Sequence, residues 1–253
     1  MVQMNDPIYD ESGFQIGIAD PLIKEKKMHT ARIIALTQPT IWTDAPGNPQ
    51  QLTVDEFIAY VARVSNPGNQ NNTLTAPKLL RYLAKHKHWS PFEMVNVVME
   101  INTTRDIGRQ ILRHRSFTFQ EFSQRYADPT KDMGFVTREA RLQDTKNRQN
   151  SIEAEDEKLA KEWADYQDFL TQHCQQVYNW AIKHGIAKEQ ARAVLPEGLT
   201  VSRMYMNGTL RSWIHYCQLR MANGTQKEHR EVAIDAWYQI VDQFPSLKDA
   251  LDI

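Results

Sequence analysis

Cysteine, long apolar runs and glycine-rich nucleotide motifs are scarce or missing in this chain of 253 residues. The two cysteines, Cys174 and Cys217, form no CxxC pair, which excludes a disulfide scaffold and favours an intracellular protein. No apolar run approaches the ~20 residues that a helix needs to span a bilayer. The N-terminal stretch MVQMNDPIYDESGF is acidic and lacks the apolar core of a signal peptide. We therefore expect a soluble, cytoplasmic protein with no membrane partner.

The chain also lacks an excess of charge of either sign. Its 30 basic and 31 acidic residues give a formal net charge of −1. A protein that grips nucleic acid through its overall field is therefore disfavoured, and any anion site must be local. His86 and His88 have no block of cysteines or carboxylates beside them, so we expect no metal site.

Apolar spacing predicts a chain built from both helices and strands. Helices are expected at residues 53–65, 78–87, 103–115, 152–184, 189–196, 209–220 and 226–244, and strands at residues 94–102 and 199–207. These elements do not alternate strictly, so the pattern favours an α+β fold with a mixed sheet flanked by helices. Residues 1–30 lack periodicity and are interpreted as an arm or tail. Residues 31–253 are interpreted as a single domain with a charged excursion near 135–163.

The segment RHRSFTFQEFSQRY (113–126) concentrates positive charge between aromatic residues. Its arginines are planar forks that suit phosphate, and its phenylalanines offer flat apolar walls. Glu121 and Ser123 lie between the arginines, which suits a ligand that carries hydrogen-bond donors as well as phosphate. The alternative is a solvated surface, because Arg113 lies at the expected C-terminal end of a helix, where cations are favoured.

The order of the motifs resembles that of flavin-dependent thymidylate synthases. The signature of that family is Arg-His-Arg, seven residues and then Ser, which stands here at 113–115 and Ser123. HWSPFE (88–93), ARAVLP (191–196) and LRSWIHYCQLR (210–220) resemble three further blocks of the family, in the same order. The resemblance covers about residues 58–240.

The resemblance implies a defined reaction and assembly. Members make dTMP from dUMP, with 5,10-methylenetetrahydrofolate as the carbon donor and FAD, reduced by NADPH, as the source of hydride, in de novo dTMP biosynthesis. They form homotetramers whose active sites are built from several subunits, and they share an α+β fold. They bind FAD without a Rossmann domain, which agrees with the lack of a GxGxxG motif or P-loop here.

The resemblance also implies the residues of the site. The positions that match the dUMP contacts of the family are Gln110, Arg113, Glu121, Ser123, Gln124, Arg125, Arg192 and Arg220. Those that match its FAD contacts are His88, Ser90, Glu93, Arg113, His114, Arg115, Thr209, Arg211 and His215. Arg220 is the expected catalytic residue, because a guanidinium beside the uracil ring would stabilise the anion formed when the ring loses a proton. Arginine stays charged, so it would act as an electrostatic stabiliser and not as a base.

Other interpretations of these residues remain open at this point. A nucleic-acid-binding module could use the arginines on a backbone and the phenylalanines to stack bases. A flavoprotein of the same fold could also carry out different chemistry. Cys217 could be a nucleophile, but a cysteine on an amphipathic helix is more often part of the core, as Trp213 and Tyr216 are expected to be. Ser123 has no evident base beside it and is interpreted as a hydrogen-bonding residue.

Overall fold

A central sheet of four strands organises the fold. The computed structural model describes residues 7–9, 15–18, 28–43, 49–248 and 250–251. The order in the sheet is β3-β4-β8-β5, with β3 at Thr30–Leu36, β4 at Asn96–Thr104, β8 at Val201–Thr209 and β5 at Thr118–Glu121. The α+β class is confirmed, and the ladders are antiparallel where a mixed sheet was expected. A parallel pair would need a crossover that returns the chain to the same end of the sheet, and the connections here do not.

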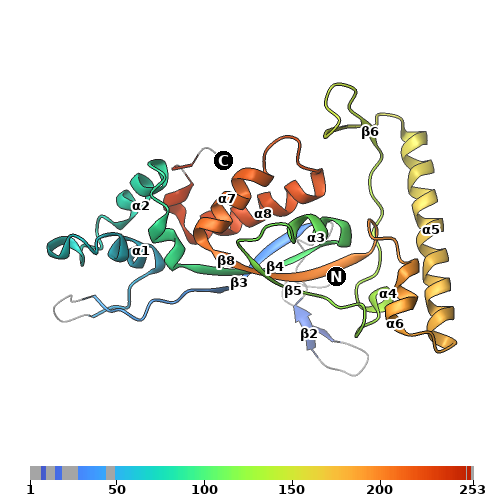
Figure 1. Cartoon of the computed structure of the whole chain (residues 1–253), viewed down its shortest axis with the longest axis horizontal. Coiled ribbons are helices and arrows are strands. Elements are labelled where there is room, and N and C mark those ends of the chain that lie inside the picture. Colours follow the sequence, from blue (N-terminus) through green and yellow to red (C-terminus); the bar gives the residue numbers. More distant parts are fainter. Residues whose placement is uncertain (1–6, 10–14, 19–27, 44–48, 249, 252–253) are drawn as a thin grey trace.

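Three helices cover one face of this sheet, and further helices lie beyond each of its two ends (Figure 1). The covering helices are α3 (Arg105–Ile111), α7 (Leu210–Arg220) and α8 (Lys227–Gln243). One end holds α1 (Val54–Ala62), η1 (Pro67–Asn69), α2 (Ala76–Lys85), η2 (Ser90–Met94) and η4 (Pro245–Leu247). The other end holds α4 (Pro129–Asp132), α5 (Glu157–Lys183), α6 (Lys188–Ala191) and η3 (Arg192–Val194). Two small ladders complete the fold, β1 (Pro7–Tyr9) with β2 (Gln15–Ile18) and β6 (Arg141–Gln143) with β7 (Ser151–Glu153).

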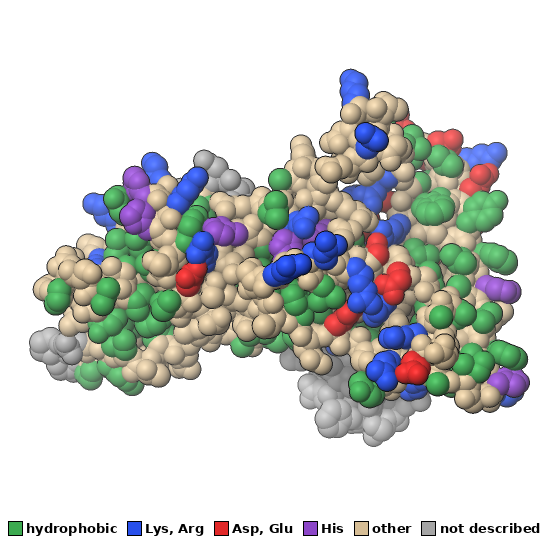
Figure 2. Space-filling view, in the orientation of Figure 1, with side chains coloured by type: hydrophobic (Ala, Val, Ile, Leu, Met, Phe, Trp, Pro, Cys, Tyr) green, Lys and Arg blue, Asp and Glu red, His purple; other side chains and the backbone are tan. Residues whose placement is uncertain are grey.

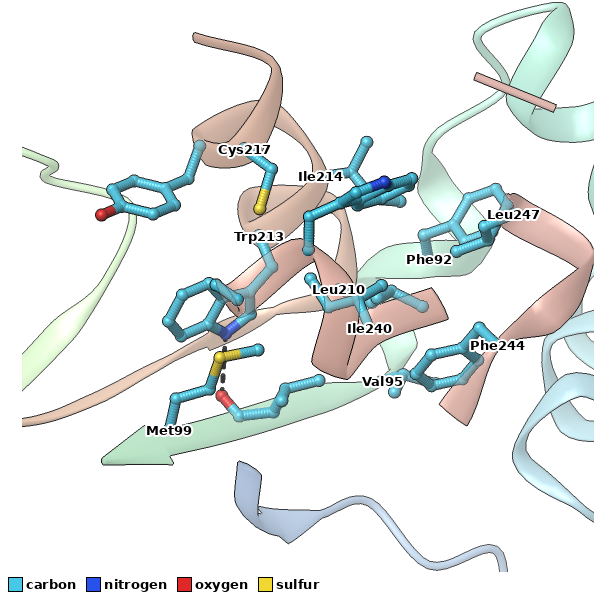
Figure 3. Packing of buried hydrophobic residues seen from close by; sticks show 14 of the residues in the cluster. Phe92, Val95, Met99, Leu210, Trp213, Ile214, Cys217, Ile240, Phe244 and Leu247 are labelled. Atoms are coloured by element: carbon cyan, nitrogen blue, oxygen red, sulfur yellow. Dashed lines mark hydrogen bonds between the residues drawn. The ribbon is translucent and has the colours of Figure 1, made fainter. Parts of the chain in front are cut away.

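The main core lies between the sheet and the helices α7 and α8. The alternation of β4 buries Val97, Met99 and Ile101 on one face, as the period-two pattern predicts. Trp213 of α7 is fully buried above them, and its indole Nε1 donates a hydrogen bond to the Val97 carbonyl at 3.0 Å (Figure 3). Cys217, on the same helix, is also fully buried. The expectation that these α7 residues are core is confirmed.

Helix ends follow from local capping. Thr53 caps α1 and forms a reciprocal capping box with Glu56. The Asp156 carboxylate accepts hydrogen bonds from the first backbone N–H groups of α5, so that helix begins at Glu157, five residues after the expected start. The helix expected at 189–196 is divided into α6 and η3.

Several strands were not predicted. These are β1, β2, β3, β5 and the hairpin of β6 and β7, which lies inside the charged excursion. Most of the N-terminal segment 1–30, interpreted as an arm, lies outside the described residues. Within the described part of the chain, no helix combines the length and apolar character needed to cross a membrane.

Candidate active site

Arg220 and His114 meet at the C-terminal end of α7. The Arg220 Nε donates a hydrogen bond to the His114 Nε2 at 2.9 Å. An arginine nitrogen can only donate, so this histidine nitrogen must carry no proton and the imidazole is neutral. Burial, followed by the charge of Arg220, lowers the pKa of His114 to about 4, which agrees with the neutral form. Two residues matched to the flavin and substrate sites of the family are therefore in direct contact.

A second histidine, His229, lies close to this pair, with its ring 6.2 Å from that of His114. His229 of α8 is fully buried, with its Nδ1 3.2 Å from the Gln110 Oε1 and its Nε2 3.1 Å from the Tyr216 hydroxyl. The amide oxygen only accepts, so Nδ1 donates to it and Nε2 accepts from the tyrosine. Burial, then the charge of Arg220, lowers the pKa of His229 to about 3. Gln110 in turn donates to Gln226 at 2.8 Å, so this expected substrate residue is held from both sides.

His229 and Gln226 were not identified from the sequence. His229 stands in a highly charged stretch, QKEHREVAI, that resembles a solvated helix face. The one available signal is helical spacing, since His229 lies on the same buried face as Val232, Ala236 and Ile240.

A polar cluster forms where α7 begins. Arg211 pairs with Glu93 of η2, although the two residues are 118 positions apart. The His215 ring packs edge-on against Trp89, with ring centroids 4.9 Å apart. Burial and then the charge of Arg211 lower the pKa of His215. Three residues matched to the flavin site, from two distant segments, are thus brought together.

The remaining positions matched to the flavin site lie around this cluster or on the Arg-His-Arg turn. Thr209 caps α7, and its hydroxyl accepts from the Ser212 N–H at 3.2 Å. Ser90 and His88 are exposed, and the His88 ring lies 6.2 Å from the Tyr82 ring. Among the described residues, no group of three or more histidines, cysteines or carboxylates could hold a metal ion.

The turn that carries Arg113 and Arg115 depends on a close approach between Phe117 and Gly208. Both arginines are exposed on this turn. Phe117 is buried directly after them and packs over β8 at Gly208. A Cβ added at Gly208 would lie 2.4 Å from the Phe117 ring, so no side chain fits there. This glycine therefore lets the phenylalanine anchor the turn.

Glu121 lies inside an ion-pair network. Its carboxylate is 3.4 Å from Arg105, 3.8 Å from Arg109 and 3.1 Å from the Ser202 hydroxyl, which donates to it. Arg105 is only 5% exposed and also donates to Glu197 at 3.1 Å. Arg105 was not identified as a site residue from the sequence. Glu121 is thus fixed by the protein before any ligand binds.

The turn after Glu121 is tied to α6. The Ser123 hydroxyl accepts from the Arg125 N–H at 3.3 Å, and Arg125 forms an ion pair with Glu189 at 3.1 Å. Arg192, which begins η3 directly after α6, is therefore carried by the element that holds this turn. Gln124 is 3% exposed, and its buried Nε2 meets no acceptor within the described part of the chain. A buried donor without a partner is costly, so it fits a site that a ligand oxygen completes.

Cys217 does not have the surroundings of a nucleophile. It is fully buried in the core, and burial raises the pKa of its thiol well above the usual range. A reactive cysteine needs an accessible thiolate, so the interpretation as a core residue holds.

The sequence of this chain matches the model of a known protein family. The family model described as "Thymidylate synthase complementing protein" matches residues 50–246. A flavin-dependent thymidylate synthase of Synechocystis is 48% identical over 221 residues, covering 87% of this chain and 98% of that protein. A probable flavin-dependent thymidylate synthase of Paramecium bursaria Chlorella virus 1 is 46% identical over 223 residues, covering 88% of this chain and 99% of that protein. The chain therefore belongs to the family of flavin-dependent thymidylate synthases, as the motifs indicated.

The fold is also that of a solved structure. The UMP/dUMP methylase PolB from Streptomyces cacaoi, crystallised with 5-Br dUMP, matches with a TM-score of 0.71 and 22% identity. The match covers 88% of this chain and 94% of that chain. At this identity the likeness supports the fold alone.

Proposed function

We propose that this enzyme converts dUMP to dTMP, with 5,10-methylenetetrahydrofolate as carbon donor and FAD, reduced by NADPH, as hydride source. The names of the two similar relatives support a flavin-dependent thymidylate synthase, and PolB is named as a methylase of UMP and dUMP. The reaction would place the chain in de novo dTMP biosynthesis.

The contact between Arg220 and His114 is the observation that carries this proposal. The neutral imidazole accepts from the Arg220 Nε, which fixes the guanidinium without cancelling its charge. No other hydrogen bond or ion pair of this side chain occurs within the described part of the chain, so its remaining N–H groups are available to a ligand. A fixed cation beside the uracil ring would stabilise the ring anion and increase electron density at the carbon that gains the methyl group.

The site residues suit a nucleotide monophosphate. Arg113, Arg125 and Arg192 are the cations proposed for the dUMP phosphate, since arginine forks match phosphate oxygens. Gln124 would use its unpartnered amide on a ligand oxygen. Ser123, Glu121 and Gln110 are already held in place by protein contacts, so they would meet dUMP in fixed positions.

The other cluster suits a flavin dinucleotide. The exposed Arg113 and Arg115 supply positive charge for a pyrophosphate, with His114 between them. Glu93, Arg211 and His215 form a polar surface at the start of α7, with Ser90, His88 and Thr209 around it. When bound, FAD would supply the hydride chemistry, and these residues would hold and orient it.

Self-association into a homotetramer is part of the proposal, and the outer face of α5 supports it. Seven exposed residues of this helix and His184, its C-cap, are spaced alternately four and three apart: Leu159, Trp163, Tyr166, Leu170, His173, Val177, Trp180 and His184. Figure 2 shows hydrophobic and histidine side chains along the edge of the molecule where Figure 1 places α5. A strict seven-residue repeat is the pattern of a helix that pairs with another helix.

The repeat is self-complementary in the antiparallel sense. A two-fold axis through the middle of α5 would set Trp163 on the partner's Trp180 and Tyr166 on the partner's Val177. Glu162 and Lys183 each directly precede a residue of the repeat, and the same axis places Glu162 opposite the partner's Lys183. Opposite charges at such flanking positions help to set the orientation of paired helices. We therefore propose an antiparallel α5 pair as one interface of the assembly.

Replacement of Arg220 tests the function. The Arg220→Ala variant should bind FAD with its normal visible spectrum and lose about 100-fold or more in kcat for dTMP, the range seen when one stabilising donor is removed. UMP in place of dUMP is the substrate control. If turnover survives in this variant, Arg220 is not the activating residue.

A further inference from the structure

A cavity of about 710 Å³ lies beside the groups already described. Its walls are the β6–β7 hairpin, the first turns of α5 and the junction of α7 with α8. Figure 2 shows Lys and Arg side chains around the hollow between the hairpin and the body of the molecule. The volume is within the range of about 300–1,000 Å³ that is typical of small-molecule sites.

The cavity is positively charged. Its lining holds two carboxylates, Glu139 and Glu153, and five cations, Arg138, Arg141, Arg148, Lys227 and Arg230, a net charge of +3 from five minus two. Three of these cations are already used, since Arg138 pairs with Asp106, Arg141 pairs with Glu228 and Lys227 pairs with Glu139. The other two are Arg148 and Arg230.

Arg148 and Arg230 are the cations left for a ligand. Arg148 has no side-chain hydrogen bond or ion pair within the described part of the chain. Arg230 has one long contact, to the Asn223 amide oxygen at 3.4 Å. The two arginines come from different walls, the hairpin turn and α8. The arrangement therefore suits a ligand with two separate anionic groups, since each guanidinium can bind one carboxylate in a bidentate manner.

The turn that carries Arg148 is organised in advance. The Asp144 carboxylate accepts from the Lys146 N–H at 2.8 Å, the Asn147 N–H at 3.1 Å and the Asn150 amide at 2.9 Å. These bonds lower the pKa of Asp144. A turn fixed in this way loses less conformational entropy when a ligand binds.

The cavity also has an apolar wall and a link to the substrate residues. Leu159 and Trp163 of α5 line it, so each presents a surface toward the cavity besides the one that would face the partner in the proposed α5 pair. Gln226, one helical turn before Arg230, also lines it and accepts the hydrogen bond from Gln110, one of the residues proposed to hold dUMP. A ligand in this cavity would thus lie beside a residue that contacts the proposed dUMP site, and would meet an aromatic ring and two arginines.

We propose that this cavity binds the tail of the folate cosubstrate. That tail is an aminobenzoyl ring followed by a glutamate with two carboxylates, which matches one aromatic wall and two free guanidinium groups. Trp163 would pack against the ring, and Arg148 and Arg230 would each bind a carboxylate. This assignment rests on the proposed function, because it takes 5,10-methylenetetrahydrofolate as the carbon donor.

The test compares Arg148→Ala, Arg230→Ala and the double variant with the FAD-loaded wild type. Each single variant should raise the KM for 5,10-methylenetetrahydrofolate by about 10-fold or more, the loss expected for one charge-assisted hydrogen bond. The kcat at saturating folate and the KM for dUMP should stay unchanged. Lys146→Ala, on the same turn but outside the lining, is the matched control and should behave as the wild type.

Equilibrium binding of tetrahydrofolate to the FAD-loaded protein separates this inference from the proposed function. Weaker binding by the double variant supports the cavity even if no dTMP forms, in which case the proposed function alone fails. A wild type that makes dTMP, with folate KM and binding unchanged in the double variant, would overturn the assignment. A rise in the KM for NADPH in place of that for folate would also overturn it.

Discussion

The Nε of Arg220 lies 2.9 Å from the Nε2 of His114, although 106 positions separate the two residues. The contact joins the last turn of α7 to the Arg-His-Arg turn, so the proposed activating cation and the proposed flavin site are mechanically linked. His114 would thus orient Arg220 as well as contact the flavin.

Replacement of His114 should separate these two roles. His114→Phe keeps a ring and removes the acceptor, so kcat for dTMP should fall by about 10- to 100-fold, the value of one hydrogen bond to a charged group. His114→Asn restores an acceptor and should recover part of kcat. Steady-state kinetics with dUMP would check this, and equal losses in both variants would contradict the orienting role.

Acid should destabilise the protein through His229. Its pKa is about 3 in the folded chain and near 6.5 for an ordinary histidine, so the unfolded chain takes up the proton first as the pH falls. The stability from neutral His229 is complete above pH 6.5 and is lost progressively as the pH falls toward 3. The Tm of the wild type should therefore drop between pH 6.5 and pH 4.

The His229→Gln variant checks this assignment. Its Tm should fall less steeply over the same pH range, measured by differential scanning calorimetry. His86→Gln, exposed at the end of α2, is the control and should keep the slope of the wild type. Equal slopes for His229→Gln and the wild type would assign the acid sensitivity to other groups, such as His114.

A methyl group at Gly208 should disturb the Arg-His-Arg turn. The added Cβ would lie 2.4 Å from the Phe117 ring, so Gly208→Ala should lower the free energy of unfolding by about 1–3 kcal/mol, the usual cost of overpacking. Gly198→Ala is the matched control, because nothing lies within 4 Å of its Cβ position. Urea unfolding of both variants would measure the difference, and a neutral Gly208→Ala would show that the turn readily shifts.

The buried Arg105 should matter more than an exposed arginine in a similar pair. Arg105→Ala removes the buried partner of Glu121 and Glu197, leaves them only the half-exposed Arg109, and should lower the free energy of unfolding by about 3–5 kcal/mol. Arg32→Ala breaks an exposed pair with Glu100 and should cost about 0–1 kcal/mol. Urea unfolding of both variants measures these losses in free energy. If the two losses are similar, the ion pairs around Glu121 stabilise the fold no more than an exposed pair does.

Charge reversal on α5 tests the antiparallel pair. Lys183→Glu sets two like charges opposite each other at each end of the pair and should weaken self-association by about 10-fold, as like charges at an interface are unfavourable. The double change Glu162→Lys with Lys183→Glu restores opposite charges and should restore assembly. Sedimentation velocity would follow both.

A substitution in the α5 seam provides the second arm of this test. Leu170→Glu should dissociate the pair, and Gln172→Glu, on a neighbouring face, should not. If Lys183→Glu and Leu170→Glu both leave the oligomer intact, α5 is not the interface.

Elements with a clear local period could be predicted from the sequence. The alternation of β4 and the apolar stripes of α7 and α8 are visible without any partner, because each element buries one face. The four-residue strand β5 was missed because Thr118–Glu121 is too short to show a period. Its identity as a strand comes from pairing with β8, some 85 residues later.

Motifs in the sequence identified most residues of the candidate site, but they did not predict which of these residues contact one another. Glu93 and Arg211 were both assigned to the flavin, yet their pairing depends on how η2 meets α7 and not on any local pattern. Glu121 was assigned to the substrate, while its partner Arg105 was not identified from the sequence. Long-range ion pairs of this kind follow from the tertiary fold, which local spacing does not encode.

The measurement that tests the central claim most directly is the product formed by the purified, FAD-loaded protein from dUMP, NADPH and 5,10-methylenetetrahydrofolate labelled at its methylene carbon. The account predicts dTMP with the label in its methyl group, and no labelled product when NADPH is omitted. Oxidation of NADPH without labelled dTMP would contradict it, and would leave a flavoprotein of this fold with different chemistry.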